Sequence, residues 1–417
     1  MKTTEKQVII IGGGPAGLAA AVALTAQGIQ DILVLEREKH LGGILRQCIH
    51  DGFGLARFGE TLSGPEYAQR YIDMAQDSEV PIACDTTVLA VNKCGDTHQI
   101  LTVSPAGMVC YHAKAVVYAM GCRERTRGAL AIPGERPAGV FTAGVAQSYI
   151  NLKNLMPAKE VLILGSGDIG MIMARRLTLE GAHVQAVCEV MPYPSGLPRN
   201  LQQCLNDYDI PLYLSHTVTA IHGNSRLTGV TVSKVDEHLR PIPGTEQEYT
   251  CDTLILSVGL IPENELSTSA GVQLDPRTKG ASVDEYYQTN IAGSFAAGNV
   301  LQVHDLVDFV SAEAERLADG VAAYLAAGNL PECPLAVTIA EGAAIGYILP
   351  QRISGKRDIV LSLRVRRPLE NCTLTISQNG KALYTQKMKK ALPAEMIQCN
   401  LMAAHLAPTG DLEVTVS

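Results

Sequence analysis

Two glycine-rich segments, each followed by an acidic residue, are the parts of this sequence whose residue types and spacing most clearly predict chemistry. The first is Gly12-x-Gly14-x-x-Gly17, and Glu36 follows at about 20 residues, the spacing of a dinucleotide-binding fingerprint. Gly12 permits a tight turn, Gly14 lets the backbone approach a pyrophosphate, and Gly17 lets a helix pack closely on a strand. The N–H groups that begin this helix would bind phosphates, and Glu36 would accept hydrogen bonds from a ribose. We therefore predict a dinucleotide site here, called the first fingerprint below.

The same pattern recurs as Gly165-x-Gly167-x-x-Gly170, with Glu189 again about 20 residues further on. A carboxylate at this position would bond the 2′-OH of NAD and repel the 2′-phosphate of NADP. The first arginine after Glu189 is Arg199, so no cation follows closely to accept that phosphate. This second fingerprint predicts a second dinucleotide site, one that favours NADH over NADPH.

Each fingerprint lies in a stretch that is typical of a strand–helix–strand unit. In the first unit, a β-branched run at 7–11 ends at the glycines, an Ala/Leu-rich helix is expected at 15–27, and a second strand at 31–36. The second unit begins at Glu160. We also expect a helix at 64–79, an antiparallel meander at 80–117, strands at 218–221, 227–235 and 253–258, and a strand followed by a long helix at about 306–327 within 283–330. The fold class is therefore α/β, with tandem Rossmann-like domains.

The character of the chain changes after Leu330. Pro331 and Pro334 mark a linker, and residues 357–417 are mostly strand-like. Turn signals occur at Asn379-Gly380 and Gly410-Asp411. We predict a small all-β domain at the C-terminus.

Composition excludes several other classes of protein. The net charge is −8 and no basic tract stands out, so nucleic acid and anionic membrane are poor partners. The apolar run from Val8 to Ile29 is broken by glycines and Pro15, so we expect no transmembrane segment. The eleven cysteines form no CxxC pair, which predicts free thiols in a reducing cytoplasm, and the histidines and cysteines lack the spacing of a metal site.

Three further motifs carry a family resemblance that covers about residues 7–330. They are Ala119-Met120-Gly121, the segment Val258 to Pro262, and the segment Thr289 to Asn299. Together with the fingerprints they resemble thioredoxin reductase and the wider pyridine nucleotide–disulfide oxidoreductases. Met120 stands where that family usually has Thr, and Asn299 where it usually has the Asp that holds FAD. The resemblance implies an FAD domain in two parts, 1–122 and 263–330, around an NAD domain at 123–262, with the β-rich domain at 331–417.

The resemblance also assigns residues to the two cofactors. It places the helix that starts near Asp305 with its N-terminus towards the flavin, with Asp305 as a plausible N-cap and His304 either structural or a proton donor. The residues predicted to bind FAD are Gly12, Gly14, Pro15, Ala16, Gly17, Glu36, Arg37, Gly43, Arg46, Val88, Ala119, Gly121, Gly298, Asn299, Leu306 and Val307, and those predicted to bind NAD are Gly165, Gly167, Asp168, Ile169, Gly170, Glu189 and Gly259.

A redox dithiol, which disulfide reductases of this superfamily use, is missing from both of its family positions. After Gly42-Gly43 the only cysteine is Cys48, at a spacing that does not match, and Thr142 to Ala146 contains none. Two thiols in contact are needed for such a relay, so the chain is not a disulfide reductase. Cys48 is either an inert buried thiol or a sulfenic-acid or charge-transfer thiolate.

The segments 42–54 and 298–311 resemble one branch more closely: NAD/FAD-dependent dehydrogenases found beside anaerobic glycerol-3-phosphate dehydrogenase, and flavoprotein subunits of opine and amine dehydrogenases. Arg46, Cys48 and His50 would line the active site, although Arg46 can equally contact an FAD phosphate or a surface carboxylate. Cys48, His50 and His304 are the candidate catalytic residues.

The predicted activity is that of an FAD-dependent oxidoreductase in which NADH reduces the flavin and a small-molecule or protein acceptor reoxidises it. Two alternatives stay open. The chain is a subunit of a larger dehydrogenase, of glycerol-3-phosphate, opine or amine type, whose β domain docks a partner; or it is a sensor that binds FAD and NAD without turnover. We also expect an oligomer.

Overall fold

The computed structural model describes residues 2–417, which divide into two units. The first unit combines the N-terminal part up to Cys122 with everything from Pro262 onward, and the second unit is Arg123–Ile261. Among the described residues, every helix is too short or too polar to cross a bilayer.

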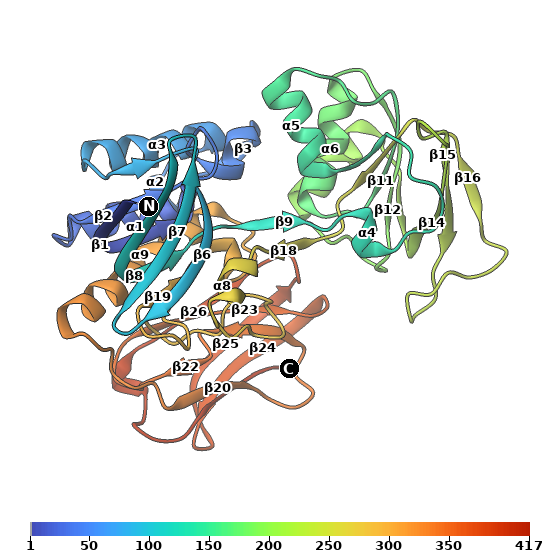
Figure 1. Cartoon of the computed structure of the whole chain (residues 1–417). Coiled ribbons are helices and arrows are strands. Elements are labelled where there is room, and N and C mark those ends of the chain that lie inside the picture. Colours follow the sequence, from blue (N-terminus) through green and yellow to red (C-terminus); the bar gives the residue numbers. More distant parts are fainter. Residues whose placement is uncertain (1) are drawn as a thin grey trace. The chain divides into compact units, whose positions relative to one another are not determined.

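The first unit is built around a mixed sheet with the strand order β5-β2-β1-β8-β7-β6, in which β19 also pairs with β8 (Figure 1). β1 runs parallel to β2 on one side and to β8 on the other, and β19 is parallel to β8. Because these four strands are parallel, their carboxyl ends meet at one edge of the sheet. The strands are β1 (Lys2–Ile11), β2 (Ile32–Leu35), β5 (Ile82–Ala83), β6 (Thr87–Cys94), β7 (Thr97–Ser104), β8 (Gly107–Tyr118) and β19 (Ser294–Ala296).

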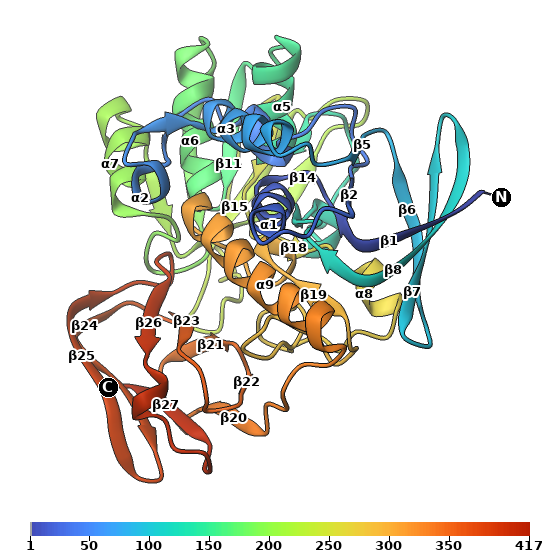
Figure 2. The same ribbon diagram turned by 90° about the vertical axis from the view of Figure 1, so that its left-hand side faces the viewer.

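The predicted strand–helix–strand unit and antiparallel meander both form. Val8, Ile9 and Ile10 are fully buried in β1, as a parallel strand covered on both faces requires. β6, β7 and β8 pair antiparallel in chain order. Figure 2 shows α1 packed beside α9. The helices of this part are α1 (Pro15–Ala26), α2 (Leu55–Phe58), α3 (Gly64–Asp77), α8 (Glu265–Ser269) and α9 (Val307–Ala327). β3 (Asp51–Phe53) pairs antiparallel with β4 (Leu62–Ser63), and α2 lies in the connection between them.

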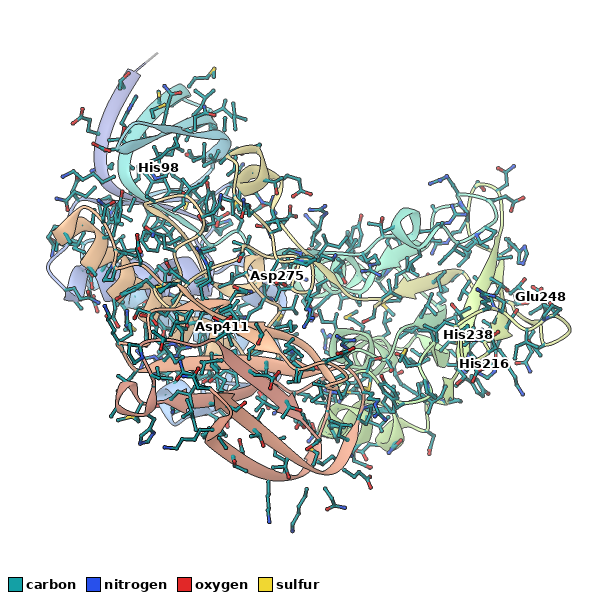
Figure 3. The ribbon with its side chains drawn as sticks, turned by 90° about the horizontal axis from the view of Figure 1, so that it is seen from below. His98, His216, His238, Glu248, Asp275 and Asp411 are labelled. Atoms are coloured by element: carbon teal, nitrogen blue, oxygen red, sulfur yellow. The ribbon has the colours of Figure 1, made fainter. Side chains whose placement is uncertain are left out.

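The second unit holds a parallel sheet in the order β10-β17-β11-β12-β13. A three-stranded antiparallel sheet, β14-β15-β16, accompanies it, and the labelled residues His216 and Glu248 of Figure 3 lie on its strands. The elements are β10 (Val140–Thr142), β11 (Glu160–Leu164), β12 (His183–Glu189), β13 (Leu212–Leu214), β14 (His216–His222), β15 (Gly229–Lys234), β16 (Gln247–Tyr249), β17 (Thr253–Leu256), α4 (Arg127–Leu130), α5 (Ala143–Lys153), α6 (Asp168–Leu179) and α7 (Pro198–Cys204), and the chain crosses between the units through β9 (Cys122–Glu124) and β18 (Leu260–Pro262).

The predicted C-terminal all-β domain is present and has a core of its own. One sheet has the order β22-β20-β27-β24-β25 and the other β21-β23-β26. Its strands are β20 (Leu335–Ile339), β21 (Ile345–Leu349), β22 (Arg352–Ile353), β23 (Ile359–Val365), β24 (Leu369–Gln378), β25 (Lys381–Ala391), β26 (Ile397–Leu401) and β27 (Leu412–Val416).

This β domain is bonded to residues 283–286, which precede it in the first unit. The N–H of Val283 donates to Oε1 of Gln351 at 2.9 Å, and the N–H of Ser354 donates to Oε2 of Glu285 at 2.9 Å. The guanidinium of Arg357 stacks over the ring of Tyr286 at 4.5 Å. We refer to this set of contacts as the 283–286 junction.

Both predicted turns of the β domain form, and they support each other. Asn379 and Gly380 both have positive φ angles, which suits the tight turn that joins β24 to β25. Gly410 has a φ of +89° and lies against the side chain of Asn379, whose Nδ2 donates to the carbonyl of Thr409 at 2.9 Å. Asp411, labelled in Figure 3, accepts a hydrogen bond from the N–H of Ala336.

These turns predict different costs for two alanine substitutions. A Cβ at Gly380 would meet no atom within 4 Å, so Gly380→Ala adds only backbone strain of about 1 kcal/mol. A Cβ at Gly410 would overlap the Asn379 amide, so Gly410→Ala should also lose that hydrogen bond and cost about 2 kcal/mol. Calorimetric Tm values should fall further for Gly410→Ala; equal falls would contradict the packing described here.

Candidate functional site

The first fingerprint occupies the carboxyl edge of the first unit's sheet, where β1 gives way to α1. Gly12 has a φ of +113°, and a Cβ there would overlap the carbonyl of Ala119. A Cβ on Gly17 would overlap the carbonyl of Gly12, which shows directly how closely helix and strand approach. At Gly14 an added Cβ would make only ordinary contact, 3.8 Å from Gly43. No side chain caps α1, so its first N–H groups are available to a phosphate.

Glu36 is fixed at the end of β2 by two backbone hydrogen bonds. Its Oε2 accepts the N–H of Gly13 at 2.7 Å, and its Oε1 accepts the N–H of Glu38 at 2.7 Å. The residue is 7% exposed. The carboxylate is therefore held against the glycine turn, where a ribose next to the pyrophosphate would meet it.

Segments that are far apart in the sequence meet at this turn. Gly43 faces Gly14, with an ideal Cβ 3.2 Å from the Gly14 Cα, and Gly298 has a φ of +77° and faces Ala16. The N–H of Ala119 donates to the carbonyl of Ile11 at 2.9 Å. The structure thus brings the first fingerprint, the Gly-Gly segment, the Ala119–Gly121 motif and the Gly298–Asn299 motif together.

Two other residues predicted to bind FAD lie beyond these segments. Arg37 follows Glu36 and is exposed. Val88 lies on β6, two residues after Thr86, whose N–H donates to the Glu36 carbonyl at 2.9 Å. Their positions are compatible with the predicted nucleotide site, and their contacts with a cofactor stay a prediction.

The second fingerprint repeats this geometry in the second unit. Gly165 has a φ of +100°, and a Cβ on Gly170 would lie 2.5 Å from the carbonyl of Gly165. Oε2 of Glu189 accepts the N–H of Ser166 at 2.9 Å, and its Oε1 accepts the N–H of Met191 at 2.9 Å. These are the counterparts of the Gly13 and Glu38 bonds to Glu36, at the same spacing.

Two hydroxyl groups distinguish the second fingerprint from the first. Oγ of Ser166 donates to Glu189 at 2.6 Å, and Oγ of Ser195 donates to it at 2.8 Å. Four hydrogen bonds therefore hold Glu189, which is 3% exposed. The second fingerprint presents a strongly fixed carboxylate.

Asp168, Ile169 and Gly259 complete the set of residues predicted to bind NAD. Asp168 opens α6 with Ile169, and its carboxylate accepts the N–H of Leu197 at 2.8 Å and the amide of Asn200. Gly259 has a φ of +97° with open space at its Cβ position. The Asp168 side chain is thus committed to holding the loop that precedes α7.

A buried polar cluster lies between the Gly298–Asn299 motif and α9. Glu313, on α9, accepts the N–H of Gly298 at 2.7 Å and lies 3.3 Å from Nε2 of His304, although that ring N–H is not aligned for a hydrogen bond. Burial raises the pKa of Glu313, but the nearby His304 and the hydrogen bonds from Gly298 and Gln302 outweigh it, so the net pKa is lowered. Glu313 is held as an anion.

Asn299 and His304 bind each other within this cluster. Oδ1 of Asn299 accepts the backbone N–H of His304 at 3.0 Å, and Nδ1 of His304 lies 3.3 Å from the same oxygen. The His304 side chain is only 1% exposed. This enclosure favours the structural role for His304 over the proton-donor role.

The N-cap role predicted for Asp305 is wrong. α9 begins at Val307, and its N-cap is Leu306, which provides no side-chain bond. Asp305 instead accepts a hydrogen bond from Arg364 of the β domain at 2.9 Å. Local spacing predicted that this carboxylate would cap the helix, but it binds Arg364, which is 59 positions away in the sequence. Leu306 and Val307 remain at the uncapped start of α9, where the prediction needs them.

Arg46, Cys48 and His50 lie on the segment that follows Gly43. Cys48 Sγ donates to the carbonyl of Ile44 at 3.4 Å, and burial raises the pKa of its thiol to about 12. The thiol is therefore protonated at neutral pH, which favours the inert reading over a thiolate. Nδ1 of His50 lies 3.0 Å from the carbonyl of Asp51, and Arg46 is half-buried. Their proximity to a substrate stays a prediction.

Sequence reasoning missed the side chains that clamp this segment to α9. Asp308 accepts the N–H of Gly54 at 3.0 Å and that of Arg57 at 2.8 Å. Glu315 pairs with the Arg57 guanidinium at 2.7 Å. The available signal was that Asp308 and Glu313 fall on the buried face of a helix, where an acid needs a partner.

Among residues 2–417, no cluster of three His, Cys, Asp or Glu side chains could hold a metal ion.

Comparison with known proteins identifies the family. Residues 6–318 match the model of the pyridine nucleotide-disulphide oxidoreductase family. The chain is 26% identical to an opine oxidase subunit of Agrobacterium tumefaciens over 78% of this chain and 65% of that protein. It is 26% identical to hydrogen cyanide synthase subunit HcnB of Pseudomonas aeruginosa over 64% of this chain and 59% of that protein. The chain thus spans less than two thirds of these relatives' lengths.

Thioredoxin reductase of Lactococcus lactis is a structural neighbour, with a TM-score of 0.64 at 23% identity, covering 77% of this chain and 99% of that one. This likeness confirms the predicted fold class. The match over most of the chain shows that it belongs to the pyridine nucleotide-disulphide oxidoreductase family. Members bind FAD and NAD(P)H, so by class this is a flavoprotein oxidoreductase with a Rossmann fold.

Substitution of the third glycine of each fingerprint, Gly17 or Gly170, should remove the binding of one nucleotide and leave the other. Gly17→Ala should remove FAD and leave NAD(H) binding in place, because its Cβ would collide only at the first fingerprint. Gly170→Ala should weaken NAD(H) at least tenfold and leave the flavin content unchanged. Flavin absorbance of the purified protein and calorimetric titration with NAD⁺ measure the two effects. If either variant lost both nucleotides while remaining folded, the assignment of one nucleotide to each fingerprint would be wrong.

Proposed function

We propose that this protein oxidises NADH at the second fingerprint and passes the electrons, through FAD held at the first, to a second acceptor without a redox dithiol. The observation that carries the proposal is the repeated arrangement in which Glu36 and Glu189 each accept two backbone N–H bonds beside a glycine turn. Two such carboxylates in one chain indicate two dinucleotides.

The chain's own groups bind and orient. The uncapped starts of α1 and α9 would offer N–H groups and the positive ends of their dipoles to a bound FAD, and Glu36 would accept from its ribose. The flavin, when bound, supplies the two-electron chemistry. Glu189 would accept from the NADH ribose, and its fixed negative charge would oppose the additional phosphate of NADPH.

The proposal that no thiol relay takes part rests on the sequence, because neither family position for the redox dithiol holds a cysteine pair. The Cys48 thiol, closest in sequence to the family's first dithiol position, has a pKa raised to about 12 by burial. Electrons would therefore pass from flavin to the acceptor directly.

A second candidate is that the chain is the flavoprotein subunit of a larger dehydrogenase. Two observations favour it: the relatives from opine oxidase and hydrogen cyanide synthase are themselves named as subunits, and the β domain adds a separate core with one largely exposed strand, β25. In this case the donor or acceptor would be bound by a partner protein. Co-purification of the tagged protein from its native cells with one stoichiometric subunit would favour this candidate.

The first test is an anaerobic titration of the purified yellow protein with NADH and then NADPH. We expect NADH to bleach the flavin band at lower concentration than NADPH. A flavin that neither nucleotide bleaches would overturn the proposed NADH oxidation and favour a sensor that binds both cofactors without turnover.

The choice between NADH and NADPH depends on Glu189. Glu189→Gln removes the charge but keeps the size, so the preference for NADH in flavin reduction should fall about tenfold or more. Glu36→Gln is the matched control, because the equivalent change at the first fingerprint should weaken FAD retention and leave the nucleotide preference unchanged. If Glu189→Gln left the ratio of kcat/KM values unaltered, the carboxylate would not be the selecting group.

A further inference from the structure

Arg364, on β23 of the C-terminal domain, binds the segment that leads into α9. Its Nη2 donates to the carbonyl of Val303 at 3.2 Å and to Oδ1 of Asp305 at 2.9 Å. Its Nη1 donates to the carbonyl of Pro393 at 2.9 Å, and its Nε donates to the hydroxyl of Tyr347 at 3.1 Å. The guanidinium thus joins the β domain to the segment just ahead of the start of α9.

The pair formed by Arg364 and Asp305 is largely removed from water. Their side chains are 14% and 8% exposed, and the N–H of Met396 also approaches Oδ2 of Asp305 at 3.4 Å. A planar guanidinium can serve several acceptors at fixed angles, which a lysine ammonium cannot reproduce. Removal of either partner leaves the other as a poorly compensated charge that is largely shielded from water.

A continuous set of bonds runs from this pair to the Gly298–Asn299 motif. His304 lies between Val303 and Asp305, the two residues that Arg364 binds, and its backbone N–H donates to Asn299. The His304 ring lies against Glu313, which in turn accepts the N–H of Gly298. Displacement of residues 303–305 would therefore act on both Asn299 and the start of α9.

We propose that Arg364 is a positioning residue of the flavin site, through which the C-terminal β domain sets the conformation of residues 303–305 and the electrostatic balance at the start of α9. The proposal rests on the proposed function, because it takes FAD to bind where Gly298, Asn299 and the uncapped start of α9 meet the first fingerprint. It gives the β domain a part in the redox site, separate from any part in docking a partner.

The charges of Arg364 and Asp305 predict opposite shifts in the midpoint potential of the flavin, which a purely structural role would not produce. In the native protein Arg364 and Asp305 balance each other. Arg364→Gln leaves a negative charge beside the start of α9, which opposes electron uptake and should lower the midpoint potential of the flavin. Asp305→Asn keeps the shape but leaves the positive charge, and should raise it. The double variant should return close to the native value.

The experiment measures the midpoint potential of bound FAD by spectrophotometric titration with dithionite and redox dyes, together with the Kd for FAD after reconstitution of the apoprotein. We expect Arg364→Gln to weaken FAD binding about tenfold, the effect of losing a charge-assisted hydrogen bond. Arg364→Lys keeps the charge and loses the planar guanidinium with its several N–H donors, so it should weaken FAD binding with little change in midpoint potential. This variant also tests the proposal if Arg364→Gln fails to fold.

Arg357→Gln is the matched control, because Arg357 joins the same β domain to the 283–286 junction without touching residues 303–305. It should lower Tm at most and leave the potential and the Kd for FAD native. If the native protein binds FAD and the Arg364 and Asp305 variants have the native midpoint potential and the native Kd for FAD, this proposal is overturned and the proposed function stands. Native protein that binds no FAD would overturn both.

Discussion

The parallel pairing of β1 with β2 and β8 is the constraint on which the rest of the nucleotide-binding fold depends. It brings the carboxyl ends of three strands to one edge, and each strand is followed there by a segment that the site needs: the glycine turn after β1, Glu36 after β2, and Ala119 to Gly121 after β8. β19 adds Gly298 and Asn299 at the same edge, through its pairing with β8. Strand register, set by buried β-branched residues, thus determines where the polar groups meet.

Much of the fold could be predicted because its signals are local. A glycine that must adopt a positive φ, such as Gly12 or Gly165, identifies a turn within a few residues. Runs of β-branched residues likewise predict the buried strands. Asn379-Gly380 is equally local, and the turn forms where it was expected. The repeat of the two halves extends to individual hydrogen bonds, so the first fingerprint is a guide to the second.

The site was predicted less completely because its side-chain partners lie far apart in the sequence. Spacing alone made Asp305 an N-cap, whereas the folded chain offers it Arg364, which donates a charge-assisted hydrogen bond. Arg57 and Asp308 are 251 positions apart, and nothing in either neighbourhood indicates the other. His304 was a candidate catalyst by its position in a motif, but enclosure by Asn299 and Glu313 depends on how α9 packs.

The division of the first unit into two stretches of chain has a consequence for biosynthesis. Arg123–Ile261 is continuous, so all its strands are available once that stretch leaves the ribosome. The N-terminal part, in contrast, presents β8 without its parallel neighbour β19, and α1 without α9, until more than half of the chain has been made. The order of completion is thus opposite to the order of synthesis: the inserted unit can close first, and the first unit, with its long-range contacts, must wait for the segment that ends in α9.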